Sequence, residues 1–178
     1  MPRLFIAIDL PATIREGLFG LGSGIPGSRS VPIEQLHLTL KFIGDIESGK
    51  LPVIRETLQE IQFSPLPLVL AGVGHFPLRG NPTVLWVGVK PSDALVVLQK
   101  RIENSLYHRG IPREGRKFFP HVTVARLNHS PAQRIAQFLA GNNLLISPEF
   151  TADSFTLYAS SLTPKGAVHT PQHSYLLK

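Results

Sequence analysis

Apolar residues recur along the chain in patterns that are typical of both strands and helices. Short aliphatic runs and alternating apolar positions indicate buried strands, and recurrence at every third or fourth position indicates helices. The predicted strands are residues 4–10, 36–43, 68–76, 84–89, 121–127, 150–158 and 174–177. The predicted helices are residues 12–21, 48–61, 92–106 and 131–141.

Turn-forming and capping residues divide these elements. Residues 23–32 are rich in Gly, Pro and Ser, so we expect a mobile connection there, and Gly44 with Asp45 is expected to end the strand before it. Ser48 and Ser92 stand where a hydroxyl caps the start of a helix. Gly110 offers the left-handed residue that ends one.

The order of the elements predicts an α+β fold. Helices alternate with strands, but strands also follow one another directly, which disfavours a doubly wound parallel sheet. With 178 residues, of which 43% are hydrophobic, the chain is expected to form a single bilobal domain over residues 1–178.

One tetrapeptide pattern occurs twice in predicted strands. His37-Leu38-Thr39-Leu40 and His121-Val122-Thr123-Val124 both read His, apolar, Thr, apolar, and the two histidines are 84 positions apart. Strand side chains alternate, so His and Thr share one face of each strand while the aliphatic residues share the other. An unpaired buried imidazole or hydroxyl costs roughly 1–3 kcal/mol, and a groove filled by water or ligand avoids that cost.

A single His-x-Thr on a strand is usually structural, whereas two copies point to a shared site. The spacing and the parallel element order indicate a duplicated unit, in which two pseudo-symmetric halves each carry one motif and face each other across one cleft. Two histidines can act as general acid and general base near neutral pH. Threonine hydroxyls can hold the oxygens of a phosphate.

Charge and composition narrow the classes of partner and chemistry. The chain carries a net charge of +6, and residues 90–178 contribute all of it, which favours a phosphate-bearing partner. The absence of cysteine excludes disulfides, thiolate metal sites and cysteine nucleophiles. Neither motif has carboxylates at ligand spacing, so no metal and no cofactor are expected. No signal peptide or membrane span is recognisable, and we expect a cytoplasmic monomer.

The sequence resembles the two-histidine phosphoesterases, and within them the RNA 2′,3′-cyclic phosphodiesterases, also called 2′-5′ RNA ligases. The resemblance covers nearly the whole chain. It depends on both motifs and their flanks, together with segments near both ends: residues 3–9, 37–44, 76–77, 85–89, 119–126 and 157–162. One departure from the family lies at Gly166-Ala167-Val168-His169, where relatives tend to carry an aromatic residue after the Gly-Ala pair.

The resemblance implies a fold and a reaction. The fold is bilobal, with antiparallel or mixed sheets around a central cleft and helices outside. The reaction is metal-independent hydrolysis of RNA 2′,3′-cyclic phosphate ends to 2′-phosphomonoesters, with reversible ligation that needs no ATP. His37 would donate a proton to the departing 3′ oxygen, His121 would accept one from the attacking water, and Thr39 and Thr123 would hold the phosphate.

Two residues five positions after the histidines are further candidates for substrate binding. Strict alternation turns Phe42 and Arg126 away from the groove, unless a bulge, a twist or a strand end restores them. If they face the groove, we expect them to sandwich the terminal base, since an aromatic ring and a guanidinium plane both stack on nucleobases. Arg113, Arg116 and Lys117 are candidates for contacts with the RNA backbone. The remaining histidines are expected at the surface or in local hydrogen bonds, although His169 and His173 in the tail could close over the cleft.

Three alternatives remain open at this point. The substrate could be another small cyclic phosphate, such as an ADP-ribose cyclic phosphate. The protein could be a noncatalytic module that binds RNA ends, which explains the charge but not the repeated His and Thr. The repeats could also be purely structural.

Overall fold

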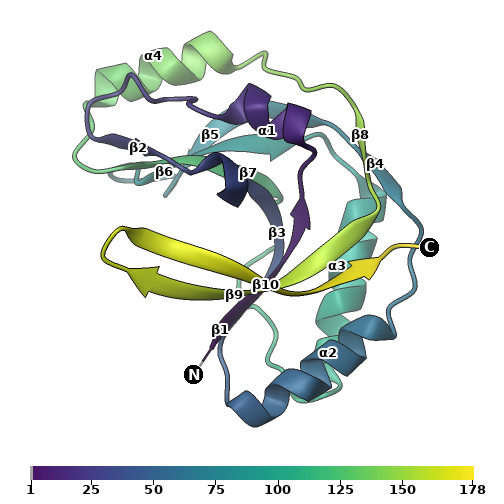
Figure 1. The fold of residues 1–178 in the computed structure, drawn as a ribbon. Coiled ribbons are helices and arrows are strands. Elements are labelled where there is room, and N and C mark those ends of the chain that lie inside the picture. The colour runs from purple at the N-terminus through teal and green to yellow at the C-terminus, as the bar shows by residue number, and fades with distance from the viewer. Residues whose placement is uncertain (1) are drawn as a thin grey trace.

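Two four-stranded antiparallel sheets form the framework of the protein in a computed structural model, which describes residues 2–178 (Figure 1). The first sheet has the order β10 (Gly166–Leu176), β9 (Ser154–Thr163), β1 (Arg3–Asp9) and β3 (His37–Asp45). The second has the order β2 (Ser28–Ser30), β7 (His121–Leu127), β6 (Val84–Val89) and β5 (Leu70–Phe76). A small ladder joins β4 (Leu66–Leu68) to β8 (Phe150–Ala152). The predicted α+β class is confirmed.

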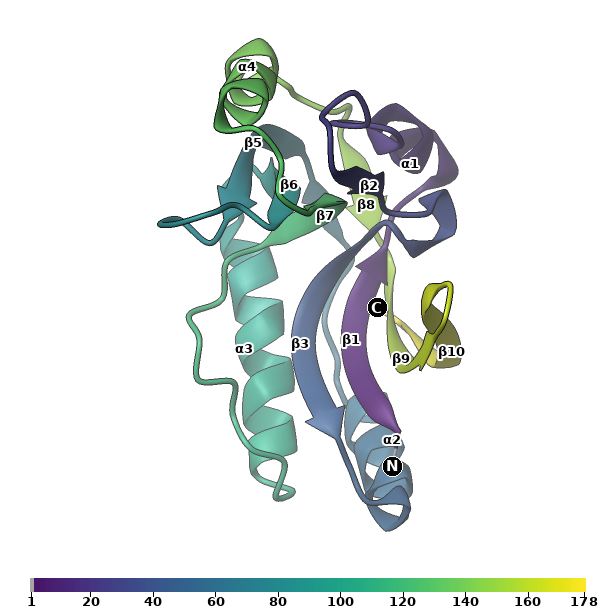
Figure 2. The same ribbon diagram turned by 90° about the vertical axis from the view of Figure 1, so that its left-hand side faces the viewer.

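Four α-helices and two short 3₁₀ helices accompany the sheets. They are α1 (Ala12–Leu18), α2 (Leu51–Gln59), α3 (Asp93–Tyr107), α4 (Ala132–Asn142), η1 (Ile33–Gln35) and η2 (Ser48–Lys50) within residues 2–178. Helix α3 packs beside β3 and α2, and α2 also contacts β10 of the same sheet (Figure 2). Helix α4 packs against β5 of the other sheet. The helices therefore lie outside the two sheets, as expected.

The two lobes are not consecutive halves of the chain. Strand β2 comes from the first quarter of the chain yet pairs with β7 in the second sheet. Strands β9 and β10 come last in the chain yet complete the first sheet, where β9 pairs with β1. Each lobe consequently contains segments from both ends of the sequence. The pseudo-symmetry of two halves stays a prediction.

Several element boundaries differ from those predicted. The predicted mobile connection contains β2, a short strand that uses the free edge of β7 and shows no hydrophobic alternation of its own. The last strand is not confined to residues 174–177 but runs over Gly166–Leu176, with Pro171 tolerated because β10 is an edge strand with a bulge there. The predicted strand 150–158 is divided into β8 and a longer β9.

The predicted capping residues have mixed outcomes. Ser92 caps α3, since its hydroxyl accepts a hydrogen bond from the Leu95 amide at 3.2 Å, and Gly110 adopts a φ of +85° just after that helix. Ser48 does not cap α2, because residues 48–50 form the 3₁₀ turn η2 and the α-helix begins only at Leu51. Strand β3 ends at Asp45, as predicted for Gly44 with Asp45, and Gly44 takes a φ of +84° as its penultimate residue.

The interior is aliphatic in both lobes. Leu4, Ile6 and Ile8 of β1 are fully buried, as are Leu85 and Val87 of β6. No helix within residues 2–178 combines the length and the apolar character that crossing a bilayer requires.

We predict that Gly74→Ala destabilises the protein, because a Cβ on Gly74 would lie only 2.2 Å from the Trp86 ring that covers it from the neighbouring strand. The indole would have to move out of its packed position, at a cost of about 1–3 kcal/mol in the free energy of unfolding. Urea unfolding measures this change. Gly49→Ala is the control, since nothing lies within 4 Å of its Cβ position. Equal stability of the two variants would contradict the prediction.

Candidate active site

A groove of about 400 Å³ lies between the two sheets and is lined by both sequence motifs. His37 and Thr39 reach it from β3, and His121 and Thr123 reach it from β7. Strands β3 and β7 contact each other although they belong to different sheets. The structure thus brings together the four motif residues, although the two motifs are 84 positions apart in the sequence.

The alternation predicted for the two motif strands is confirmed. Leu38 and Leu40 of β3 are buried in the core, and so are Val122 and Val124 of β7. The His and Thr side chains between them are half-buried and lie on the groove side. Each strand therefore buries its aliphatic face in its own lobe and presents its polar face to the groove.

A β-bulge occurs at the same place in both motif strands. In β3, Thr39 lies opposite Ala7 and Lys41 lies opposite Ile6, so the residue between them is extra. In β7, the register likewise skips one residue between Thr123 and Ala125. The extra residue shifts the alternation by one position.

The bulges return two candidate residues to the groove. Phe42 and Arg126 both line it, although strict alternation would have turned them away. Both side chains are exposed, and Phe42 is 57% exposed, which is unusual for a phenylalanine in a strand. All six residues predicted for the site therefore border one groove.

Each motif histidine is oriented by the same backbone contact. The Nδ1–H of His37 donates to the Gln35 carbonyl at 2.5 Å, and that of His121 donates to the Phe119 carbonyl at 2.7 Å. The carbonyl lies two residues before the histidine in both cases. A carbonyl only accepts, so it selects the tautomer with the proton on Nδ1 and leaves Nε2 free to exchange a proton in the groove.

His37 has the more buried imidazole of the pair. Its ring stacks on Phe5 with centroids 5.1 Å apart, and the Tyr158 ring lies 5.2 Å from Phe5 and 6.4 Å from His37. Burial lowers the pKa of His37 to about 4, although the Gln35 carbonyl acts in the opposite direction. The ring is neutral at pH 7 in the ligand-free protein.

His121 lies in a separate aromatic cluster. Its ring centroid is 5.0 Å from that of Phe76 and 6.2 Å from that of Trp86. Burial lowers the pKa of His121 below its usual value, and the hydrogen bond to Phe119 opposes that change. Both histidines are therefore weaker bases than a free imidazole, and their protonated forms are stronger proton donors.

A third histidine, His169, borders the groove and also makes a local hydrogen bond, and both were possibilities that the sequence left open. His169 of β10 has its ring centroid 5.7 Å from that of His37, and its Nδ1 lies 3.1 Å from the Ser160 hydroxyl. Burial, together with the charge of Arg126, lowers the pKa of His169. The departure from the family at residues 166–169 was the one sequence signal that marked this position.

The turn between β9 and β10 forms another wall of the groove and is tied to the opposite side. The side chain of Gln35 donates to the Ala167 carbonyl at 2.7 Å, and Arg29 donates to the Lys165 carbonyl at 3.1 Å. These contacts join η1 and β2 to the turn.

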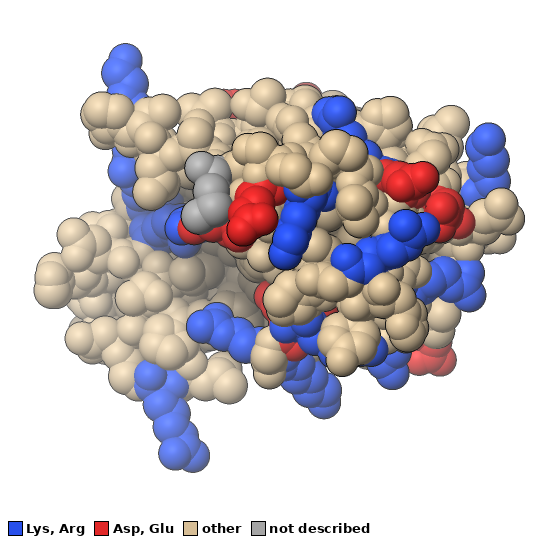
Figure 3. Space-filling model, turned by 90° about the horizontal axis from the view of Figure 1, so that it is seen from below, with Lys and Arg blue, Asp and Glu red and all other residues tan. Residues whose placement is uncertain are grey.

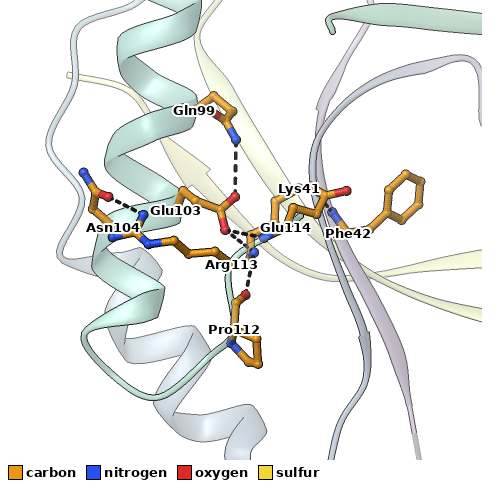
Figure 4. Close-up of polar contacts among 8 residues, drawn as sticks. All are labelled: Lys41, Phe42, Gln99, Glu103, Asn104, Pro112, Arg113 and Glu114. Atoms are coloured by element: carbon orange, nitrogen blue, oxygen red, sulfur yellow. Dashed lines mark hydrogen bonds and ion pairs between the residues drawn. The ribbon is translucent and has the colours of Figure 1, made fainter. Parts of the chain in front are cut away.

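A buried ion pair connects β3 to the segment that leads into β7 (Figure 4). Lys41 is 1% exposed, and its ammonium donates to Glu103 of α3 at 2.5 Å and to the Pro112 carbonyl at 3.0 Å. Glu103 also accepts the Glu114 amide, while the Glu114 carboxylate accepts the Phe42 amide at 3.4 Å. Burial raises the pKa of Glu114. The network thereby fixes residues 112–114 beside the bulged part of β3.

The loop cations predicted to contact RNA lie outside the groove. Arg113 donates to Asn104 at 2.6 Å and stacks over Tyr107 at 4.2 Å, so it is held against α3. Arg116 and Lys117 are exposed and are not among the residues that line the groove. Within residues 2–178, no three His, Asp or Glu side chains are grouped so that they could hold a metal ion.

Comparisons with known proteins identify the family. A model of the 2′-5′ RNA ligase superfamily matches residues 25–163. An RNA 2′,3′-cyclic phosphodiesterase of Archaeoglobus fulgidus is 35% identical over 94% of this chain and 96% of its own length. One from Thermotoga maritima is 32% identical over 94% and 91%. The chain belongs to the 2′-5′ RNA ligase superfamily.

Solved structures agree with this assignment. Escherichia coli LigT complexed with 3′-AMP superimposes with a TM-score of 0.79 at 30% identity, over 100% of this chain and 99% of that one. Other structures of the same protein are complexes with NADP+, ATP and phosphate. The family, the fold and the enzyme class predicted from the sequence, a cyclic phosphodiesterase, are confirmed.

We predict that Lys41→Met costs about 3–5 kcal/mol in the free energy of unfolding, because it leaves the Glu103 carboxylate buried without its cation. The double variant Lys41→Met/Glu103→Met regains much of this loss, since it removes the buried charge as well as its partner. Urea unfolding of both variants and the wild type measures the difference. A single variant as stable as the wild type would show that the pair is not buried in solution.

Proposed function

We propose that the groove hydrolyses RNA 2′,3′-cyclic phosphate ends to 2′-phosphomonoesters, with His37 as the proton donor and His121 as the proton acceptor. The observation that carries the proposal is that one His and one Thr from each of two sheets border a single groove, with both imidazoles oriented by the same backbone contact. The cyclic phosphodiesterase activity named for the A. fulgidus and T. maritima relatives supports it.

The reaction needs two proton transfers on opposite sides of phosphorus. Nε2 of His121 takes a proton from water as the water oxygen bonds to phosphorus. The bond between phosphorus and the 3′ oxygen breaks, and Nε2–H of His37 gives its proton to that oxygen. The products are a 3′-hydroxyl and a 2′-phosphate. A 5′-hydroxyl of a second RNA in place of water would form a 2′-5′ linkage by the same steps.

Four further residues would bind the substrate. The hydroxyls of Thr39 and Thr123 donate to nonbridging phosphate oxygens and stabilise the charge that develops on them. Phe42 and Arg126 hold the terminal base between a ring and a guanidinium plane, which tolerates any base. The LigT complexes with 3′-AMP, ATP and NADP+ support a nucleotide as the ligand of this kind of groove.

Phosphorus NMR of a short RNA that ends in a 2′,3′-cyclic phosphate, in excess chelator, tests the proposal. We expect the wild type to form a 2′-phosphate, and His37→Ala and His121→Ala each to lose about 10²–10⁴-fold in rate, because each removes one proton-transfer group. His108→Ala is the control, since His108 is exposed and lies outside the groove. Binding of the RNA without turnover would favour a noncatalytic module that captures RNA ends, and activity that survives either substitution would refute the assigned roles.

The lowered histidine pKa values predict an acidic optimum for kcat/KM. His37 must be protonated, so activity falls as pH rises above its pKa of about 4, and His121 must be neutral, so activity falls as pH drops below its pKa, which lies under 6.5. The maximum therefore lies below pH 6.5. Bound phosphate raises the pKa of His37, so the alkaline limb of kcat should lie at a higher pH than that of kcat/KM. A kcat/KM that increases up to pH 8 would contradict the assignment.

A further inference from the structure

The groove is lined by basic side chains and by no acidic ones. Arg3, Arg29, Arg126 and Lys165 border it, and none of the other residues that line it is an aspartate or glutamate. Arg3 is paired with Asp45 at 3.3 Å. Among residues 2–178, no carboxylate lies within 4 Å of the charged nitrogens of the other three. Figure 3 shows a hollowed face with Lys and Arg side chains at the edge of the hollow.

Two of these cations lie directly opposite each other. Arg29 of β2 and Arg126 of β7 are register partners in the antiparallel ladder. Directly opposite residues have Cβ atoms about 4.5–5.5 Å apart, and like charges in that relation are destabilising. This pair lies at the centre of a strand of only three residues, so the repulsion acts on a short ladder. An anion between the two guanidinium groups would remove it.

Arg29 is also held in a defined place. Its guanidinium donates to the carbonyl of Lys165 at 3.1 Å, which joins it to the β9–β10 turn and brings a third cation to the same end of the groove. An arginine has five N–H donors in one plane. The contact with Lys165 therefore leaves donors of Arg29 available for a ligand.

This cluster is separate from the place where the two histidines act. Arg126 lies three residues beyond Thr123, which is on the order of 10 Å along a strand. The motif threonines and the paired arginines therefore offer two different positions in the groove for a phosphate. Arg126 can stack on a base with its face and donate to an anion with its edge, so the two roles are compatible.

We propose that Arg29, Arg126 and Lys165 form a second phosphate subsite, which binds the phosphate on the 5′ side of the terminal nucleoside. This inference rests on the proposed function and specifies its substrate: a nucleotide or RNA end that carries a 5′ phosphate is preferred over a simple nucleoside 2′,3′-cyclic phosphate. Arg29 sets this preference, because its guanidinium lies opposite Arg126 and has no carboxylate partner among residues 2–178 and no role in base stacking or proton transfer.

Steady-state kinetics with adenosine 2′,3′-cyclic phosphate and its 5′-phosphorylated form test the subsite. We expect the wild type to favour the phosphorylated substrate by about 10-fold or more in kcat/KM, through KM, and Arg29→Gln to bring this ratio close to 1. Arg29→Lys retains the charge without the planar donors and should give an intermediate ratio. Arg79→Gln is the matched control, since Arg79 is exposed in the β5–β6 loop and outside the groove, and it should keep the wild-type ratio.

Salt and product binding separate this inference from the proposed function. The wild-type preference should shrink as NaCl increases, and that of Arg29→Gln should not.

Calorimetry with adenosine 2′-phosphate and adenosine 2′,5′-bisphosphate needs no turnover: the wild type should bind the bisphosphate about 10-fold more tightly, and Arg29→Gln should bind both equally. If no cyclic phosphate is hydrolysed but this binding difference is found, the proposed function fails and the subsite stands. Equal binding of both by the wild type, or an unchanged ratio in Arg29→Gln, overturns the subsite.

Discussion

Strands β3 and β7 must each bury one face in the core of their own lobe, and the position of the groove follows from this requirement. Leu38, Leu40, Val122 and Val124 have almost no exposed surface. Side chains alternate along a strand, so the histidines and threonines between these residues are excluded from both cores. Since the two sheets meet along β3 and β7, the two polar faces border the same space.

A single extra residue then decides what else reaches that space. The bulge after each threonine reverses the alternation and turns a ring on one strand and a guanidinium on the other towards the groove. The two strands differ at the next position, where β3 has the buried Lys41 and β7 has Ala125. The charge of Lys41 requires a buried partner, and Glu103 supplies it while it also holds the loop that leads to His121. The ion pair therefore links the two motif strands through α3.

The groove attracts an anion through its arginines and Lys165, while its two motif histidines stay uncharged in the ligand-free protein. Both motif histidines are neutral at pH 7 because they are partly buried, whereas the arginines and Lys165 that line the groove are cationic. A bound phosphate lowers the repulsion among the arginines and raises the pKa of a nearby imidazole. In the proposed mechanism, phosphate binding and protonation of His37 are thus coupled, so the proton donor gains its proton most readily when the substrate anion is bound.

The sequence by itself determined the features that depend only on interactions between residues close together in the chain. The two motifs, the alternation that gives each its polar face, the helix that begins after Ser92 and the α+β class could all be read from residue spacing, and the repeated His-x-Thr with its flanks identified the family. Strands without a hydrophobic pattern were missed. Ser28–Ser30 and the first part of β10 form because neighbouring strands offer free edges.

Only the tertiary structure decided how distant residues meet. Alternation could not reveal whether Phe42 and Arg126 face the groove, because a bulge depends on the register with a partner strand. The place of His169 beside His37 depends on β9 pairing with β1, which brings the end of the chain to its beginning. The Arg29–Arg126 pair follows from the register of β2 on β7. The spacing of residues predicts the secondary structure and the polar face of a single segment. Contacts between segments are determined by packing and hydrogen bonding across the whole fold.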